Sequence, residues 1–373
     1  MKSFEVELNN ARKDGDFHVT QIAETSPIVE VFSAMVDGKD IPKNTKDGRK
    51  IDTNGCVERI KELNTAAAAG DMKAHAELNT LRKYNAEPKL LEEVKFTLGL
   101  FGQYQALGYD ETPEVEAYSI EGEKSRFQSP NGDVVFPIAA KEKYQVPTKA
   151  ISGGHVVDYR KALFGDMTRE NELISQIKTD IRNKATLYCV VKLYNQIKNA
   201  VGVKFINEAA GITKVAVDTV NSNVRRFGRT NILGDYAMVS QLNGWAGYQG
   251  TNPAVAGVSE AVMERIRKDG VIDWYNGSFV VELPNQYDLT ALNAAKDNFN
   301  TILPTSLLWF LPNGQRPIIR TFTRGGLTSF SGNDIPTGKI ITRFDLEIAL
   351  DLEKGSEHKI GLISDNTNGV PTL

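Results

Sequence analysis

The sequence predicts an α+β protein with elements long enough to cross the molecule. Residues 166–200 contain no proline or glycine and show a continuous helical pattern. Residues 340–352 alternate apolar and polar side chains, as a half-buried strand does, and residues 113–160 hold two strand-like segments around a turn. A long helix, a long strand and an extended β-ribbon together indicate an elongated or flat subunit.

The composition is typical of a soluble chain that buries a substantial core. Of its 373 residues, 41% are hydrophobic and 24% are charged, which is enough for two or three structural units. The formal net charge of −3 argues against a sequence-reading DNA-binding protein, although it leaves room for local phosphate contact. Cys56 and Cys189 lie far apart in the sequence, and we expect both to be buried free thiols. No apolar run approaches about 18 residues and residues 1–17 are too charged for a signal peptide, so we expect no membrane insertion.

Residues 1–112 are expected to form an N-terminal arm with helices. A helical pattern covers 57–84 with a break at Gly70, and a second pattern begins after Pro88. Their apolar stripes are narrow and need a partner surface. Two interpretations stay open: a helical pair packed on its own domain, or an arm that docks on other subunits.

Residues 113–160 are expected to form the β-ribbon. Strand-like segments at 115–120 and 134–138 lie on either side of the Pro-Asn-Gly sequence at 130–132, which is a strong signal for the tip of a hairpin. An isolated two-stranded ribbon is at best marginally stable in water. The ribbon therefore either folds back on its own domain or lies on a neighbouring copy of the chain.

The helix at 166–200 is expected to be the centre of the fold. It carries Ile174, Ile177, Ile181 and Tyr188 on one face. Its length of about 50 Å is close to the diameter of roughly 54 Å expected for a compact globule of this size. The helix would therefore cross the whole molecule.

Residues 203–312 are expected to form a compact α/β unit with its own core. The patterns predict strands at 230–234, 277–283 and 306–311 and helices at 235–242 and 258–269. Glycine-containing turns between these segments are typical of short connections.

The strand at 340–352 would extend about 43 Å, which is comparable with the long helix. We expect its apolar face to pack on the helix at Ile174, Ile177 and Ile181. That apolar face consists of Phe344, Leu346, Ile348, Leu350 and Leu352. The acidic residues of the opposite face are expected to lie in solvent: Asp345, Glu347, Asp351 and Glu353.

The sequence contains no motif that predicts chemistry. Phosphate-binding glycine loops and a serine nucleophile elbow are absent, and the histidines and cysteines lack the spacing of metal ligands. Gly325 and Gly326 lie beside Arg320 and Arg324 and could bind an anion, but a glycine turn between strands is the more common cause of such a pattern. Similarly, three arginines surround a phenylalanine at 225–229, where a solvated helix end is more common than a phosphate site. We therefore predict no catalytic, cofactor-binding or metal-binding residue.

The order of these elements resembles that of the major capsid proteins of tailed bacteriophages, whose fold is named after phage Hong Kong ninety-seven. The resemblance covers about residues 90–365. It rests on the order of the elements and on short segments of similar sequence. Its segments are GGHVVDYRKALFG, DMTRENELISQIKTDIRNKA, WYNGSFVVELPNQYD, LPTSLLWFLPNGQRPIIRTF and TGKIITRFDLEIALDL.

The resemblance implies five segments with distinct structures. They are an N-terminal arm with helices at 1–112, an extended loop at 113–160, the spine helix of a peripheral domain at 161–209, an axial domain at 210–312, and returning peripheral strands with a C-terminal tail at 313–373. Subunit contacts are expected, outside any catalytic role, at Gln128, Pro130, Asn131, Gly132, Arg320, Arg324, Gly325 and Gly326. No residue is assigned to a covalent cross-link, and the N-terminal arm is expected to be retained rather than cleaved.

The resemblance also implies a function and partners. Copies of the chain would form the pentamers and hexamers of an icosahedral phage head around double-stranded DNA, with assembly in the host cytoplasm. Scaffolding, portal and decoration proteins would be partners, DNA contact would be non-specific, and no cofactor would be needed. One alternative is the shell protein of an encapsulin-like nanocompartment, which the roughly 110 residues before the ribbon disfavour. The other is a soluble α/β enzyme or ligand-binding protein, which the lack of a site motif disfavours.

Overall fold

The computed structural model describes residues 26–367 with ten gaps. The gaps are 46–47, 49, 122–137, 159–167, 246–263, 265–267, 269, 294–295, 314–316 and 335–338. The expected hairpin tip at 130–132 and most of the expected helix at 258–269 lie outside the described residues.

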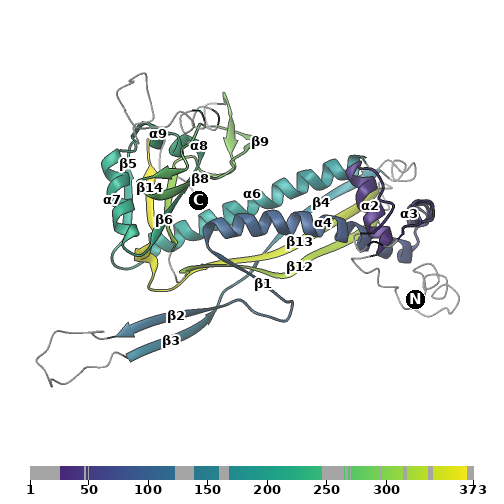
Figure 1. Ribbon diagram of the computed structural model, residues 1–373, viewed down its shortest axis with the longest axis horizontal. Coiled ribbons are helices and arrows are strands. Elements are labelled where there is room, and N and C mark those ends of the chain that lie inside the picture. The colour runs from purple at the N-terminus through teal and green to yellow at the C-terminus, as the bar shows by residue number, and fades with distance from the viewer. Residues whose placement is uncertain are drawn as a thin grey trace, which may run out of the picture.

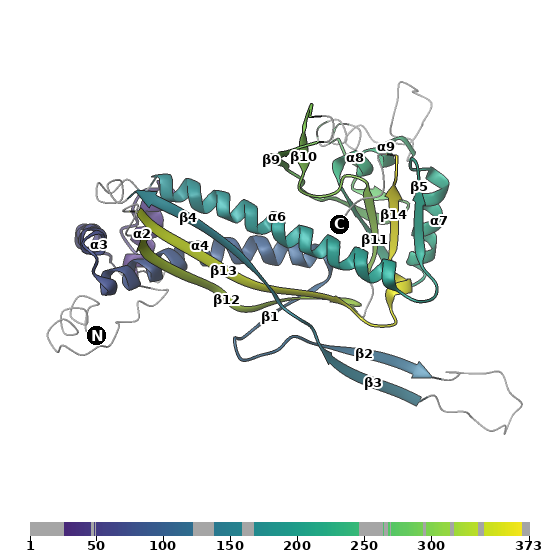
Figure 2. The same ribbon diagram turned by 180° about the vertical axis from the view of Figure 1, so that it is seen from behind.

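The protein has an elongated body with an α/β unit at one end and a β-ribbon that extends toward the same end (Figure 1). Two long helices, α4 (Met72–Phe101) and α6 (Thr168–Asn199), run along the body. They lie over a four-stranded sheet, called the peripheral sheet here (Figure 2). Its strands, in spatial order, are β1 (Gln103–Leu107), β12 (Ile319–Asp334), β13 (Lys339–Leu352) and β4 (Lys149–Asp158). The expected spine helix and long strand are both confirmed.

The apolar stripe of α6 is buried against this sheet, as the sequence predicted. Ile174, Ile177 and Ile181 belong to one core cluster with Phe344, Leu346 and Ile348 of β13. Gly153 of β4 allows a close approach here, because a side chain at that position would begin 3.1 Å from Ile177. In the second half of α6 the buried residues cover a wider face of the helix. Burial there raises the pKa of the Cys189 thiol. Cys56, expected to be buried as well, is only half-buried, and neither cysteine forms a disulfide.

The N-terminal helices pack on the body of their own chain. They are α2 (Pro27–Asp37), α3 (Thr53–Ala68) and α4. Asn79 on α4 donates a hydrogen bond of 2.7 Å to the carbonyl of Ser329 on β12, and Glu93 forms an ion pair of 2.9 Å with Lys178 on α6. Of the two interpretations left open by the sequence, packing on the same domain therefore holds for residues 26–101, apart from the gaps.

Pro88 does not separate two helices as expected, because α4 continues through it. An internal proline removes one helical hydrogen bond and costs about 3 kcal/mol. Burial of Ala86, Leu90 and Val94 on the turns around it offsets that cost.

The α/β unit, called the axial unit here, is built on a six-stranded sheet. Its strands, in spatial order, are β5 (Phe205–Ala209), β14 (Gly361–Asp365), β11 (Leu307–Asn313), β6 (Arg229–Gly234), β8 (Ser278–Glu282) and β7 (Trp274–Tyr275). The helices are α7 (Lys214–Arg225), α8 (Tyr236–Val239) and α9 (Gln241–Trp245), and a separate hairpin consists of β9 (Tyr287–Leu292) and β10 (Phe299–Thr301). The strands predicted at 230–234, 277–283 and 306–311 are present, and the helix predicted at 235–242 is divided into α8 and α9.

Two strands of the axial sheet, β5 and β14, lie outside the segment 210–312 that was expected to form the axial domain. β14 lies within the segment expected to return to the peripheral sheet, yet it pairs with β5 and β11. Gly361 in β14 permits the close packing of α7, because a side chain there would begin 2.4 Å from Val220. The axial unit is therefore joined to the body by three connections, one after α6, one between β11 and β12, and one after β13.

The ribbon consists of β2 (Glu114–Glu121) and β3 (Ile138–Gln145), paired antiparallel. The first strand was predicted correctly. The second was expected at 134–138, whereas the described strand begins at Ile138 and continues to Gln145.

None of the helices in the described part of the chain is long and apolar enough to span a membrane.

Candidate subunit-contact surfaces

The base of the ribbon is fixed to the peripheral sheet on the face opposite the spine helix. Val115 and Val146 form a small buried cluster with Phe322 on β12 and Ala349 on β13. Phe322 and Ala349 are directly paired across the two strands, so they share one face of the sheet. The ribbon therefore leaves the body in a defined direction.

A buried carboxylate links the ribbon, the sheet and the spine helix. The hydroxyl of Tyr144 on β3 donates a hydrogen bond of 2.7 Å to Asp351 on β13, and Gln196 on α6 donates one of 2.6 Å to the same carboxylate. Burial, together with the bond to Asp351, raises the pKa of Tyr144, so the hydroxyl stays protonated and keeps donating. The ammonium of Lys354 lies 4.2 Å from the centre of the Tyr144 ring.

This arrangement corrects one expectation from the sequence. Asp351 and Glu353 were expected in solvent, but both are buried. Alternation along a strand predicts which residues share a face, and it does not reveal that Tyr144 of the ribbon and Gln196 of α6 both reach Asp351 near the end of the strand. Asp345 and Glu347, farther along the strand, are half-exposed as expected.

Arg324, Gly325 and Gly326 form a bulge inside β12 rather than a turn between strands. The pairing of β12 with β13 shifts between Arg324 and Leu327, and both glycines have positive φ angles of 74° and 68°. A side chain at Gly325 would begin 2.3 Å from the ring of Tyr109. Arg324 donates to the carbonyl of Tyr109 at 2.9 and 3.2 Å and lies 3.6 Å from the Glu347 carboxylate. The arginine is therefore held by its own chain, which leaves no anion site here.

The remaining predicted contact residues have different positions. Arg320 lies half-buried on β12, paired in register with Asp351. Gln128, Pro130, Asn131 and Gly132 lie outside the described residues. The structure thus places Arg320 and the bulge on one strand.

The arginine-rich segment at 225–229 is the exposed end of α7, as the sequence favoured. Phe227 lies against two rings of its own chain, with centroids 5.4 Å from His358 and 6.4 Å from Phe205. Arg225 donates a hydrogen bond to the carbonyl of Asn276. The segment therefore packs on the axial unit and closes no anion pocket.

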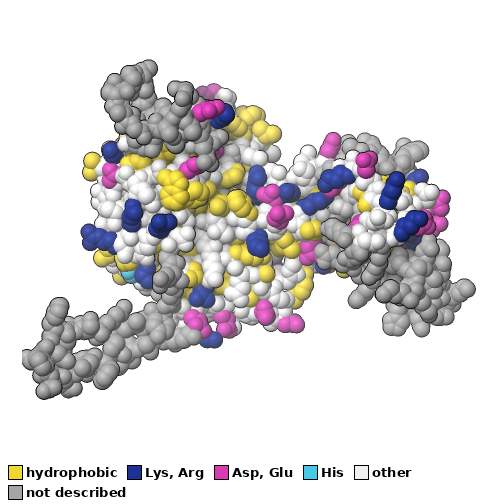
Figure 3. Space-filling view, in the orientation of Figure 1, with side chains coloured by type: hydrophobic (Ala, Val, Ile, Leu, Met, Phe, Trp, Pro, Cys, Tyr) yellow, Lys and Arg dark blue, Asp and Glu magenta, His cyan; other side chains and the backbone are white. Residues whose placement is uncertain are grey.

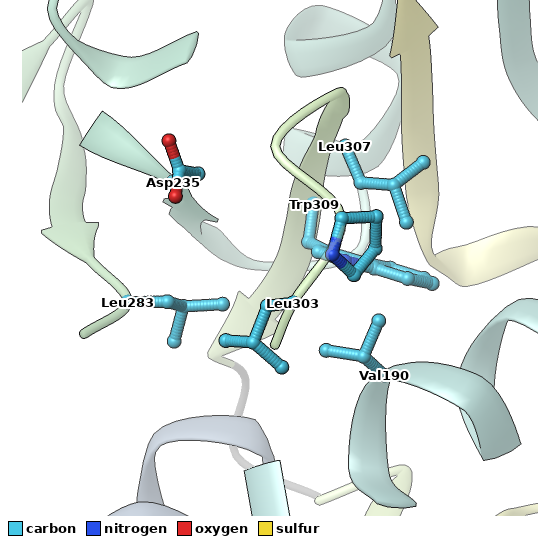
Figure 4. A pocket seen from close by; sticks show the side chains of 7 residues that line it. Val190, Asp235, Leu283, Leu303, Leu307 and Trp309 are labelled. Atoms are coloured by element: carbon cyan, nitrogen blue, oxygen red, sulfur yellow. The ribbon is translucent and has the colours of Figure 1, made fainter. Parts of the chain in front are cut away.

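The junction between α6 and the axial unit contains a very small cavity. Figure 4 shows Val190 of α6 opposite Leu303 and Trp309, with Asp235 at the side. The cavity has a volume of about 10 Å³, which is enough for a single water molecule. The Asp235 carboxylate is satisfied by Asn285, which donates a hydrogen bond of 2.6 Å. This cavity is far smaller than ligand pockets, which occupy hundreds of cubic ångströms.

Exposed apolar side chains mark the hairpin of β9 and β10, as the space-filling view shows (Figure 3). They are Tyr287, Leu289, Leu292 and Phe299. Sequence analysis did not identify this hairpin, although the alternation of Tyr287 and Leu289 with polar neighbours was an available signal.

In the described part of the chain, no three His, Cys, Asp or Glu side chains are grouped to hold a metal ion.

Solved structures that match this chain have low sequence identity to it. A chain from Microbacterium phage Oxtober96 is 8% identical, with a TM-score of 0.47, and the match covers 72% of this chain and 90% of that one. The capsid of a native GTA particle is 13% identical, with a TM-score of 0.46 and coverage of 73% and 90%. The mature capsid of bacteriophage PhiM1 is 10% identical, with a TM-score of 0.45 and coverage of 70% and 84%. No curated protein sequence matches the chain.

A family comparison identifies the chain more directly. Residues 8–364 match the model of the family described as "SPbeta prophage-derived putative capsid protein YonB". The match includes the helices of the body, the ribbon, the axial unit and the returning strands. The protein therefore belongs to the YonB family of prophage-derived capsid proteins.

Proposed function

We propose that this capsid protein is the major shell subunit, and that its copies form pentamers and hexamers that tile an icosahedral head around double-stranded DNA. Membership of a capsid protein family makes the chain a structural component of the virion. The proposal adds how the copies assemble and what the shell encloses.

The ribbon is the observation that carries the proposal. Within the described residues, β2 and β3 pair with each other, and Val115 and Val146 are buried at the base of the ribbon. The strands then extend away from the body (Figures 1 and 2). Because an isolated two-stranded ribbon is marginally stable, contact with a neighbouring copy would stabilise it.

The peripheral sheet offers a surface for that contact. Val156, Phe330 and Ile341 are exposed on the same sheet face as the ribbon base, at the far end of the strands. The registers Ile341 with Val156 and Phe330 with Arg343 place them together. We assign this apolar patch to the ribbon of a neighbouring copy, with the tip at 128–132 among the contacts. Such contacts are individually modest, and a closed lattice multiplies them.

The domain boundaries follow the same interpretation. We assign 113–160 to the extended loop, and 1–112 and 161–209 to the peripheral domain with its arm. Residues 210–312 form most of the axial domain, which β5 from the segment 161–209 and β14 from the segment 313–373 complete. Scaffolding, portal and decoration proteins are proposed as further partners. Contact with packaged DNA is proposed to be non-specific, and the small net charge of −3 is consistent with a shell that contains DNA without binding it tightly.

Electron microscopy of the expressed full-length chain tests the proposal. Closed particles of uniform size are expected, and nuclease-protected DNA is expected inside native particles. A shell that protects an enzyme instead of DNA would favour the nanocompartment. A rounded monomer at every concentration would exclude a shell subunit.

A further inference from the structure

We propose that the β9–β10 hairpin of one copy docks in the groove between β5 and α7 of the next copy, so that axial units join head to tail in a closed ring. This inference rests on the proposed function and specifies the contact that forms each pentamer or hexamer. The occupant of the groove is a second copy of this chain.

The hairpin presents apolar side chains that the described part of the chain leaves exposed. Leu289 is 73% exposed, and Tyr287, Leu292 and Phe299 are also exposed. β9 and β10 pair only with each other among the described strands. Exposed apolar clusters of this kind mark interaction sites in soluble proteins.

The base of the hairpin is nevertheless held firmly. Asn183 on α6 donates a hydrogen bond of 2.9 Å to Gln286, and the backbone N–H of Ile302 donates one of 2.9 Å to the carbonyl of Gln286. Asn285 donates to Asp235 and to the carbonyl of Leu303. A fixed base means that little conformational entropy is lost when the hairpin docks.

The groove has the properties of a receptor for an extended segment. It has a volume of about 370 Å³ and lies between the edge strand β5 and helix α7. Its lining residues are Lys204, Phe205, Ile206, Asn207, Thr213, Val215, Ala216, Thr219, Val220 and Asn223. Val215 is 75% exposed at its rim. In the described sheet β5 pairs on one side only, with β14, so its other edge is open to an added strand.

The positions of the two features determine the symmetry of the contact. The hairpin lies on one side of the axial unit, and β5 and α7, which line the groove, lie on the opposite side in both views (Figures 1 and 2). A single copy cannot bring them together. Because the two surfaces differ, their contact is heterologous, and repeated rotation closes it into a ring.

Charges on the two surfaces are complementary. Lys204 is the charged residue that lines the groove, and Lys214 begins the adjacent helix α7. The hairpin carries Asp288 and Asp297 beside Lys296. Hydrogen bonds from Thr290 hold the pKa of Asp288 below its usual value, so its carboxylate is charged when it meets the groove. Complementary charge favours the correct partner surface and speeds encounter.

Disulfide trapping in assembled particles tests the contact. Leu289→Cys and Val215→Cys are introduced together in the full-length chain with Cys56→Ala, and the particles are oxidised with diamide. Non-reducing gels should show a ladder that ends at five and six subunits. The matched control pairs Leu289→Cys with Met72→Cys, whose side chain is 80% exposed on the body, and should give no ladder.

The possible outcomes separate this contact from the proposed function. Particles that assemble but give no more ladder than the control would overturn the docking and leave the shell function intact. If the cysteine pair prevents assembly, Leu289→Asp decides: a folded chain with at least tenfold fewer particles is expected, while Ser222→Asp, on an exposed turn of α7, should assemble normally. Wild-type particle yield from Leu289→Asp would exclude the contact. Absence of particles from the wild-type chain would overturn the proposed function itself.

Discussion

The hydroxyl of Tyr144 in the ribbon lies 2.7 Å from the carboxylate of Asp351 in the peripheral sheet and donates a hydrogen bond to it. The same carboxylate accepts a hydrogen bond from Gln196 on the spine helix. One buried acidic side chain therefore sets the position of the ribbon relative to both layers of the body.

Tyr144→Phe should lower the free energy of unfolding by about 1–3 kcal/mol, because it leaves the buried Asp351 carboxylate with one donor fewer. Urea unfolding followed by circular dichroism measures the change. The control is Tyr109→Phe, which removes the exposed hydrogen bond to Thr328 and should cost less than about 0.5 kcal/mol. Equal losses of unfolding free energy in the two variants would show that the hydrogen bond to Asp351 stabilises the fold no more than the exposed hydrogen bond to Thr328.

Ile177→Asp should prevent soluble folding. Ile177 is buried between α6 and the peripheral sheet, and an unpaired buried carboxylate costs several kcal/mol. The soluble fraction after expression and the thermal unfolding curve report the effect. Gln176→Asp introduces the same charge at the exposed neighbouring position and should fold normally. Wild-type stability of Ile177→Asp would mean that the apolar stripe is not buried.

Gly325→Ala should destabilise the fold by at least about 1–2 kcal/mol, because its φ of 74° is unfavourable for residues with a side chain. The added methyl group would also collide with the Tyr109 ring. Gly332→Ala lies on the same strand, where an added side chain meets no atom within 4 Å, and serves as the control in thermal unfolding. Equal melting temperatures of the two variants would show that the fold does not require glycine at position 325.

Acid should weaken the attachment of α2 to α4 through Asp37. Partial burial raises the pKa of Asp37, but hydrogen bonds from Lys89 at 2.5 Å and Lys39 at 3.1 Å outweigh it and hold the pKa below its ordinary value. The folded pKa lies below the unfolded one, so the stabilisation is present above about pH 4 and is lost as the pH falls through the folded pKa.

Urea unfolding at about pH 6 and about pH 3 tests this linkage. Wild type should lose more stability over this interval than Asp37→Asn, and Lys89→Met should reduce the difference more than Lys39→Met, since Lys39 is 74% exposed. A constant gap between wild type and Asp37→Asn at both pH values would contradict the linkage.

Deletion of residues 122–133 should leave a folded subunit that assembles poorly. The deletion removes the expected ribbon tip, which lies outside the described residues, and spares the base at Val115 and Tyr144. Circular dichroism checks the fold, and electron microscopy counts particles. Normal shells from this variant would remove the proposed role of the ribbon tip.

The longest elements could be predicted from the sequence because their patterns are strong and local. The spine helix and the strand β13 agree with their expected bounds within two residues at each end, and the apolar faces of both were identified correctly. Each carries a single period over many residues, so one misplaced residue does not change the assignment.

Features that depend on contacts distant in sequence could not be predicted. The pattern around Pro88 predicted a helix break there, whereas tertiary burial keeps α4 continuous. Burial of Asp351 depends on Tyr144 and Gln196, which no strand pattern indicates. The groove beside β5 exists because α7 packs at the edge of a sheet whose neighbouring strand, β14, comes from the far end of the chain.

The position of β14 has a consequence for synthesis of the protein. β5 joins the axial sheet only through β14, which ends at Asp365, so most of the chain must leave the ribosome before that sheet is complete. Until β14 is in place, β5 has no strand to pair with in the axial sheet. The proposed docking groove beside β5 is therefore complete only after the chain has been translated past Asp365.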